Sequence, residues 1–183
     1  MKQHIFYESC FYSHFQAPNS EELTDFVYSK DEVYKKYDWA EDCSVKTIAC
    51  KWEESIDLLA PSVDQFADSI GSSFDWTIYN PWINCYRRGD YQEMHEHSRY
   101  DFSCVFFPEV KEDYSKFCFY NRHSTLLSTS WIKLLEDSLN TNWYPKIKSG
   151  DIIFFPGTLL HGVTQHRSDD VRKTLSCNFD FNL

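Results

Sequence analysis

Short apolar and aromatic runs alternate with turn residues from about residue 74 to the end of the chain. Such runs, with β-branched residues and regular turns between them, are typical of an antiparallel sandwich or barrel. The predicted strands are 74–79, 82–88, 102–107, 116–120, 143–147, 151–155, 161–166 and 171–181. The second part of the chain is therefore expected to be mostly β.

The first part of the chain has a helical period. Between residues 61 and 70, apolar side chains recur three, four and seven positions apart, which places them on one face of a helix. Similar spacing predicts a helix over residues 20–37, and alternation predicts a strand over 44–52. One more short helix is expected over residues 130–139, between two of the predicted strands.

The last predicted strand carries polar side chains on one face. These residues are Arg172, Thr174, Ser176, Asn178 and Asp180. In a barrel that encloses a small ligand, such a face can point inward while helices cover the apolar exterior. We therefore predict a double-stranded β-helix (jelly roll) with N-terminal helices on its outer face. Residues 1–183 are expected to form one domain, with 1–73 as the helical cover and 74–183 as the β core.

Composition supports a folded domain and narrows its partners. Hydrophobic residues make up 42% and aromatic residues 18% of the chain, which is ample for a core. The formal net charge of -10 disfavours binding to nucleic acid. Seven cysteines without a C-x-x-C pair indicate free thiols in a reducing compartment. No segment resembles a signal peptide or a membrane span, so we expect a cytoplasmic protein without a membrane partner.

Three histidines are spaced for a metal site. His95 and His97 are two residues apart, so on an extended segment both imidazoles point to the same side. His161 follows an apolar strand and a Pro-Gly turn, and it supplies a third ligand. Three protein ligands leave coordination positions open for water, substrate and dioxygen, as a catalytic metal requires.

The third ligand remains open at this point. Glu96 points to the opposite face of an extended segment, and Asp101 lies four residues beyond His97. Either carboxylate could join the site only through a local bulge. The chain has seven histidines, and a histidine without a ligand role is common in a core or on a surface.

The region from Asn84 to Leu183 resembles the iron(II)- and 2-oxoglutarate-dependent oxygenases. It is similar in particular to small predicted enzymes of that superfamily from marine bacteria and cyanophages. The resemblance rests on Asn84-x-Tyr86-x-x-Gly89, His95-x-His97, the run Phe102–Phe107, Gly150-Asp151 leading to Phe155-Pro156 and His161, and Arg172-x-Thr174-x-Ser176-x-Asn178-Phe179.

The resemblance implies a dioxygenase that hydroxylates a C–H bond of its substrate with Fe(II), 2-oxoglutarate and O2. His95, His97 and His161 would be the catalytic metal ligands. His97 stands where the family usually has a carboxylate, which makes the site more positive by one charge. Arg172, eleven residues after His161, falls where the family binds the distal carboxylate of 2-oxoglutarate. Its planar guanidinium suits a carboxylate on physical grounds as well.

Three more residues are candidates for the cosubstrate site: Thr174, Tyr86 and Asn84. Thr174 is a second donor to the same carboxylate, and the other two share a face of the predicted strand 82–88. The main alternative is a cupin, which would use the same three histidines as a metal enzyme or metal-binding module without 2-oxoglutarate. The substrate is not identified by the sequence, and a small molecule or a peptide is expected.

Overall fold

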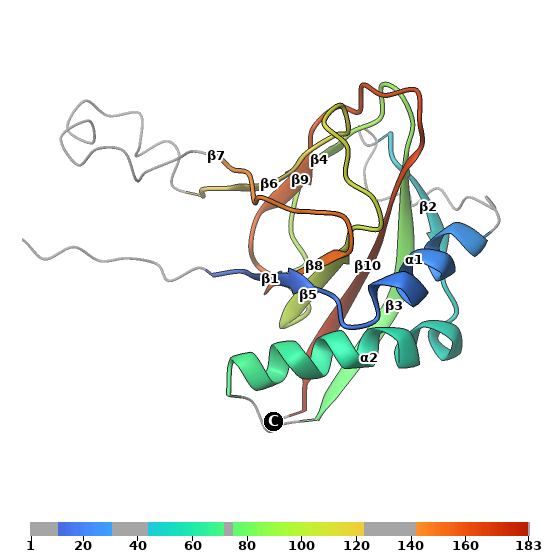
Figure 1. Ribbon diagram of the computed structural model, residues 1–183. Helices are drawn as coiled ribbons and strands as arrows, with labels where there is room; N and C mark the ends of the chain where they lie inside the picture. Colours follow the sequence, from blue (N-terminus) through green and yellow to red (C-terminus); the bar gives the residue numbers. More distant parts are fainter. Residues whose placement is uncertain (1–10, 31–43, 72–74, 123–141, 183) are drawn as a thin grey trace, which may run out of the picture.

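The computed structural model describes residues 11–30, 44–71, 75–122 and 142–182. They form two antiparallel sheets and two helices (Figure 1). The larger sheet has the order β1 (Ser13–Gln16), β8 (Asp151–Pro156), β5 (Phe102–Phe106), β10 (Arg172–Phe181), β3 (Trp76–Tyr86) and β2 (Lys46–Ala49). The smaller sheet has the order β4 (Gln92–His95), β9 (His161–Val163), β6 (Phe117–Tyr120) and β7 (Asn142–Trp143).

The two long strands β3 and β10 lie side by side through the middle of the larger sheet (Figure 1). We predicted two strands, 74–79 and 82–88, but β3 is one continuous strand. Its register against β10 shifts between Ser176 and Asn178, which pair with Trp82 and Tyr79 respectively. The extra residue on β3 lies at the Asn80-Pro81 step, and a bulge accommodates a proline because the missing N–H is not needed there.

The helices α1 (Ser20–Ser29) and α2 (Trp52–Ser69) lie against the larger sheet (Figure 1). Leu23 and Val27 of α1 are fully buried one helical turn apart. Phe66 of α2 is also fully buried, and its ring stacks on Phe154 of β8 at 4.6 Å between centroids. Burying such a side chain is worth roughly 2–3 kcal/mol, so α2 is held to the sheet by its apolar face.

The start of α2 differs from the prediction. The spacing of apolar side chains predicted a helix over residues 61–70. Instead α2 begins at Trp52 and Pro61 lies inside it. Ser55 and Leu59 extend the buried stripe of Val63 toward the N-terminus, and this tertiary packing outweighs the cost of the proline.

Other elements follow the prediction to different degrees. The strands at residues 102–107, 116–120, 151–155 and 171–181 are confirmed within one residue at each end, as β5, β6, β8 and β10. The predicted strands at 44–52, 143–147 and 161–166 are shorter in the structure, as β2, β7 and β9, and β1 and β4 were not predicted. The helix expected over 20–37 ends as α1 at Ser29, and residues 31–43 lie outside the described residues, as does the helix expected over 130–139.

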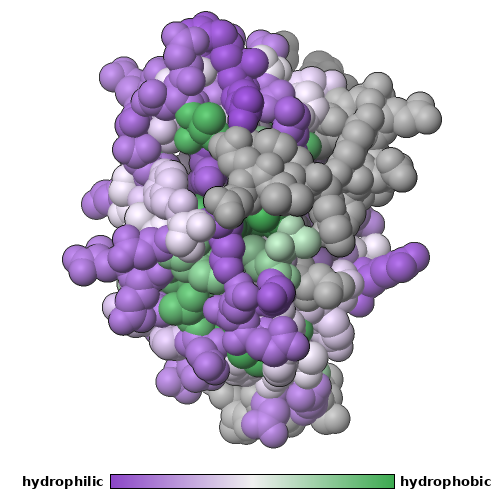
Figure 2. All heavy atoms as spheres, turned by 90° about the vertical axis from the view of Figure 1, so that its right-hand side faces the viewer, coloured by the Kyte–Doolittle hydropathy of each residue, from purple (hydrophilic) through white to green (hydrophobic). Residues whose placement is uncertain are grey.

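A second core lies between the two sheets. It joins Phe107, Ile153 and Phe155 of the larger sheet region to Phe117 and Phe119 of β6. Mostly β structure with two sheets and two helices confirms the predicted fold class. The face that carries α1 and β2 is mainly hydrophilic where it is described, with apolar groups in small patches (Figure 2). Among the described residues, no helix is long and apolar enough to cross a membrane.

Candidate metal centre

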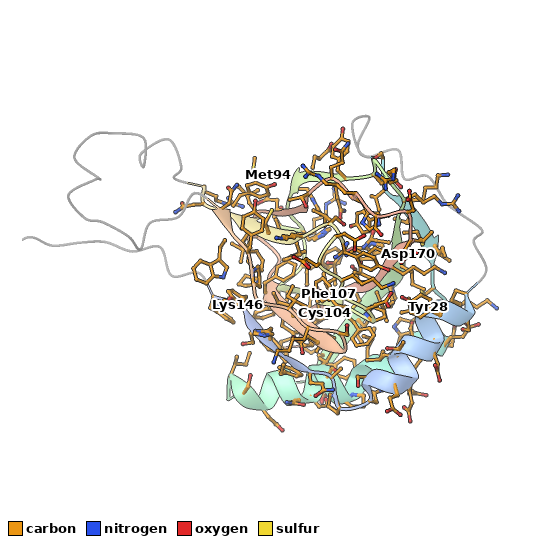
Figure 3. All side chains as sticks on the ribbon, turned by 45° about the horizontal axis from the view of Figure 1, so that its top comes forward. Tyr28, Met94, Cys104, Phe107, Lys146 and Asp170 are labelled. Carbon is orange, nitrogen blue, oxygen red and sulfur yellow. The ribbon has the colours of Figure 1, made fainter. Side chains whose placement is uncertain are left out.

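His95 and His161 are paired directly across the two strands β4 and β9 of the smaller sheet. Their ring centroids are 4.2 Å apart. Side chains alternate along β4, so Met94 is 54% exposed at the edge of the molecule (Figure 3), whereas the ring of His95 packs against that of His161. His161 is 4% exposed and its ring packs against Phe155 and Phe117. The sheet therefore fixes two imidazoles side by side.

His97 joins these two rings from just beyond the end of β4. Its ring centroid lies 5.1 Å from that of His95 and 5.2 Å from that of His161. The backbone N–H of His97 donates to the carbonyl of Gly157 at 2.7 Å. Any Cβ at position 157 would lie 2.3 Å from the carbonyl oxygen of Tyr100 and 2.6 Å from that of His97. Glycine at 157 thus permits the close backbone approach that positions His97.

The three histidines present their ring nitrogens to one point. One nitrogen from each ring lies within 4.8 Å of the others, a spacing that a single metal ion can bridge. The Nδ1 atoms of His95 and His161 each lie 2.8 Å from the carbonyl oxygen two residues earlier, of Glu93 and Leu159. A carbonyl only accepts, so Nδ1 carries the proton and Nε2 keeps its lone pair for a metal.

Burial keeps all three imidazoles neutral. Burial lowers the pKa of His95, and burial together with the neighbouring His95 lowers the pKa of His97 to about 4. The pKa of His161 lies well below its usual value because the ring is buried beside the other two. Neutral imidazole is the form that binds metal, so the site is ready for an ion at neutral pH.

The two nearby carboxylates are held elsewhere. Glu96 forms an ion pair with Arg122, whose guanidinium also donates to the carbonyl of Thr158. The carboxylate of Asp101 accepts a hydrogen bond from the backbone N–H of Phe181 at the end of β10. Neither belongs to the cluster of possible ligands among the described residues.

Arg172 begins β10 and lies in the same cavity as the histidines. It is 3% exposed, and its Nη1 atom has no hydrogen-bond partner among the described residues. The guanidinium carbon lies 4.8 Å from the ring centroid of Tyr86 and 5.6 Å from that of Phe107. Burial lowers the pKa of Arg172, but guanidinium remains charged in proteins. A buried cation with an unused donor marks a place where an anion can bind.

The remaining predicted residues line the same cavity as Arg172 and the histidines. Asn84 is buried, accepts a hydrogen bond from the indole of Trp82 at 3.1 Å, and donates to Ser176 at 3.0 Å. The amide of Asn84 and the hydroxyl of Thr174 are 3.5 Å apart, which is a long hydrogen bond. The hydroxyl of Tyr86 donates to Gln92 at 2.8 Å. All seven predicted site residues therefore line one cavity.

The cavity itself is small as the side chains lie. Its volume is about 20 Å³, which is room for an ion or a water molecule. A larger ligand requires the polar side chains between the two ends to move apart. Figure 3 shows Cys104 near the centre of the molecule, where its thiol lies 2.9 Å from that of Cys177 across β5 and β10. None of the five cysteines of the described ranges forms a disulfide bond.

Sequence reasoning missed several cavity residues. Gln92, Ser176 and Cys177 line the cavity without having been proposed for the site. Ser176 was identified only as part of the polar face of the last strand. Gln92 lies three residues before His95, and on a regular strand this spacing places two side chains on opposite faces. The sequence pattern therefore did not point to Gln92.

Comparison with known families identifies a related group. Residues 80–178 match the protein family described as "Putative 2OG-Fe(II) oxygenase", which is more than half of the chain. The match spans all three histidines and Arg172. No curated protein has a significantly similar sequence.

Solved structures share the fold at low sequence identity. A 2OG-Fe(II) oxygenase family oxidoreductase from Burkholderia pseudomallei is 15% identical, with 92% of this chain and 84% of that chain covered and a TM-score of 0.63. A Pseudomonas putida prolyl-4-hydroxylase is 14% identical, with coverage of 92% and 91% and a TM-score of 0.63. HygX from Streptomyces hygroscopicus, with nickel, 2-oxoglutarate and hygromycin B bound, is 8% identical, with coverage of 94% and 83% and a TM-score of 0.64.

Proposed function

Since the chain belongs to the 2OG-Fe(II) oxygenase family, we propose that His95, His97 and His161 bind its Fe(II) and that Arg172 binds 2-oxoglutarate. The protein is a dioxygenase that uses Fe(II), 2-oxoglutarate and O2, and the family match favours this reading over a cupin. The residues that perform these roles are our assignment.

One observation carries the assignment. Three neutral imidazoles line one cavity, and one nitrogen of each ring lies within 4.8 Å of the others. The same cavity is lined by the buried guanidinium of Arg172, whose Nη1 atom has no hydrogen-bond partner among the described residues. Of the described residues that line this cavity, only Arg172 carries a formal charge. A ligand that binds both ends must therefore supply negative charge at the arginine and metal-binding atoms at the histidines. 2-Oxoglutarate has carboxylates at both ends and meets this requirement.

The protein contributes binding and orientation. When bound, Fe(II) with 2-oxoglutarate and O2 supplies the oxidising power that attacks a substrate C–H bond. Arg172 is proposed to hold the distal carboxylate through its planar donors, with Thr174 as a second donor. The amide of Asn84 is proposed to exchange its present bonds for bonds to the cosubstrate, and Tyr86, whose ring lies against Arg172 and whose hydroxyl bonds to Gln92, is proposed to support the same site. Packing of His161 against Phe155 and Phe117 keeps water away from the buried ligand.

The charge of the site suits a dianionic cosubstrate. Three neutral imidazoles leave both charges of Fe(II) uncompensated, whereas a carboxylate ligand would remove one of them. The carboxylate of 2-oxoglutarate nearest the metal offsets part of that charge, and the other carboxylate offsets the charge of Arg172. The all-histidine set is therefore compatible with the cosubstrate, although the metal is more positive than in a site with one carboxylate.

We further propose a small molecule or a peptide as the substrate. HygX, whose fold is similar, has nickel, 2-oxoglutarate and hygromycin B bound, which supports a small molecule as the substrate. Cysteines that are buried as thiols, such as Cys118, support a reducing, cytoplasmic location. The packing of α1 and α2 on the larger sheet supports one domain, in which these helices cover a β core built mainly from residues 74–183, with β1 and β2 as its edge strands.

An anaerobic titration tests the proposed function. Addition of 2-oxoglutarate to the Fe(II) protein is expected to produce a visible metal-to-ligand charge-transfer band with one iron per chain. In Arg172→Ala, the band should require a much higher concentration of 2-oxoglutarate while the iron content stays the same. A wild-type protein that binds iron but gives no band contradicts the cosubstrate assignment. A band with unchanged affinity in Arg172→Ala contradicts only the role of Arg172.

A further inference from the structure

Gln92 connects the two ends of the cavity. It is the first residue of β4, is 7% exposed, and lines the cavity together with the histidines and Arg172. Its Oε1 atom lies 2.8 Å from the hydroxyl of Tyr86, and its Nε2 atom lies 3.4 Å from Nε2 of His95. The ring of Tyr86 in turn lies under the guanidinium of Arg172. A continuous chain of contacts thus runs from the arginine to a proposed metal ligand.

The direction of each hydrogen bond in this chain follows from one fixed group. The carbonyl of Glu93 can only accept, so Nδ1 of His95 carries the proton of the neutral ring. Nε2 of His95 is then an acceptor, and the atom of Gln92 facing it must be the amide NH2. The carbonyl oxygen of Gln92 therefore faces Tyr86, whose hydroxyl donates to it.

Metal binding is incompatible with the bond between Gln92 and His95. The lone pair on Nε2 of His95 is the one that a metal would take, and it can serve only one partner. When a metal takes it, an amide N–H of Gln92 loses its acceptor while its carbonyl oxygen stays anchored by Tyr86. A buried N–H without a partner costs about 1–3 kcal/mol, so a new acceptor close to the metal is favoured.

We propose that this released N–H donates to an oxygen atom of 2-oxoglutarate at the metal end of the cavity, an inference that rests on the proposed function. Gln92 is thereby a cosubstrate-binding residue. Metal binding at Nε2 of His95 frees an N–H of the Gln92 amide, and the hydrogen bond from Tyr86 to the carbonyl oxygen of Gln92 holds this amide in the cavity. Metal and cosubstrate binding are coupled through this side chain in addition to the direct bonds between them.

Separate titrations of metal and cosubstrate test the role of Gln92. In Gln92→Leu, the affinity for Ni(II), measured alone by competition with a chromophoric chelator, should equal or exceed that of wild type, because the bond from Gln92 to Nε2 of His95 competes with the metal. The affinity of the anaerobic Fe(II) protein for 2-oxoglutarate should fall by about tenfold, as expected for one lost hydrogen bond. The position of the charge-transfer band should also shift, which a merely structural role would not cause.

Two further variants keep the test decisive. Gln92→Glu has nearly the same shape and still accepts from Tyr86, but its carboxylate cannot donate; it should bind Ni(II) at least as tightly as wild type and 2-oxoglutarate less tightly. This variant decides the question if the leucine variant does not fold. Gln165→Leu is the matched control, because Gln165 is exposed and its amide donates to the carbonyl of Gly89 outside the cavity. Both affinities should be unchanged in this control.

The outcomes separate this inference from the proposed function. If wild type gives the charge-transfer band and both Gln92 variants bind 2-oxoglutarate as tightly as wild type, the inference about Gln92 is wrong and the proposed function stands. If Ni(II) and 2-oxoglutarate affinities fall together in both variants, Gln92 only supports the shape of the metal site, which also overturns the inference. A wild type without the band contradicts the proposed function itself.

Discussion

His95 and His161 face each other across the β4–β9 ladder, with their ring centroids 4.2 Å apart and each Nδ1 bonded to a carbonyl two residues earlier. Two hydrogen-bonded strands therefore determine the spacing of two proposed ligands without any metal. His97 is different, because it lies beyond the end of β4 and depends on the backbone contact with Gly157. This difference leads to the first prediction.

Two substitutions of His97 test whether the metal needs a third protein ligand and whether that ligand must be neutral. His97→Ala should lower the affinity for Fe(II) or Ni(II) by at least about 100-fold, since loss of even an outer partner of a metal ligand costs 10–100-fold. His97→Asp should keep one metal per chain, because a carboxylate is also a suitable ligand. Metal content by elemental analysis and chelator competition measure both effects. The control is His14→Ala on β1, next to Asp151 and outside the ligand cluster; a full metal content and affinity in His97→Ala would rule out His97 as a ligand.

Arg172 is expected to cost stability in the protein without ligands. Its guanidinium is buried, and no described carboxylate forms an ion pair with it. Arg172→Met keeps much of the volume and removes the charge, so it should raise the free energy of unfolding by about 1–3 kcal/mol. Urea denaturation of the metal-free protein measures this change. Arg88→Met is the control, since Arg88 is exposed and paired with Asp169, and it should change stability by less than about 0.5 kcal/mol. A less stable Arg172→Met would mean that the arginine is needed for folding.

The predicted site and the predicted fold came from different signals in the sequence. The order of strands was readable because apolar runs separated by turn residues mark strands wherever they occur. The last strand was also interpreted correctly: Arg172, Thr174 and Ser176 form a polar face that is buried in the cavity. A polar strand face is informative because it cannot be buried without partners or a ligand.

Long-range packing explains the errors. The predicted helix over residues 61–70 begins nine residues earlier in the structure, at Trp52, because Ser55 and Leu59 continue its buried face. The bulge in β3 depends on register against β10, which local sequence does not specify. Gln92 was not recognised because its role depends on contacts with Tyr86 and His95, and these contacts depend on how β3 and β4 meet in space.

Glycine at position 157 should be required for the metal centre. In Gly157→Ala, the new Cβ would lie 2.3 Å from the carbonyl oxygen of Tyr100, which is backbone and cannot rotate away. The variant should lose about 2–4 kcal/mol of stability from overpacking and strain, and its metal affinity should fall because His97 is displaced. Gly71→Ala is the control, because its Cβ meets nothing within 4 Å and only the positive φ of 71° is unfavourable.

The two alanine variants are compared by urea denaturation and Ni(II) competition. Gly71→Ala should lose only about 1 kcal/mol, which is typical for a non-glycine residue at a positive φ, and should bind Ni(II) as wild type does. Equal losses of stability in the two variants, with normal Ni(II) binding in both, would show that the backbone near His97 can adjust to a side chain.

Acid should destabilise the metal-free protein through His97. Burial and the neighbouring His95 lower the pKa of His97 to about 4, whereas a histidine in the unfolded chain titrates near 6.5. Between these values the unfolded chain binds more protons than the folded one, so the free energy of unfolding falls as the pH is lowered from about 6.5 to about 4. Urea midpoints at a series of pH values should fall less steeply over this range in His97→Asn, which has no titrating group at this position. Identical slopes in the two proteins would mean that the ring of His97 is already solvated in the folded state and is not held neutral for a metal.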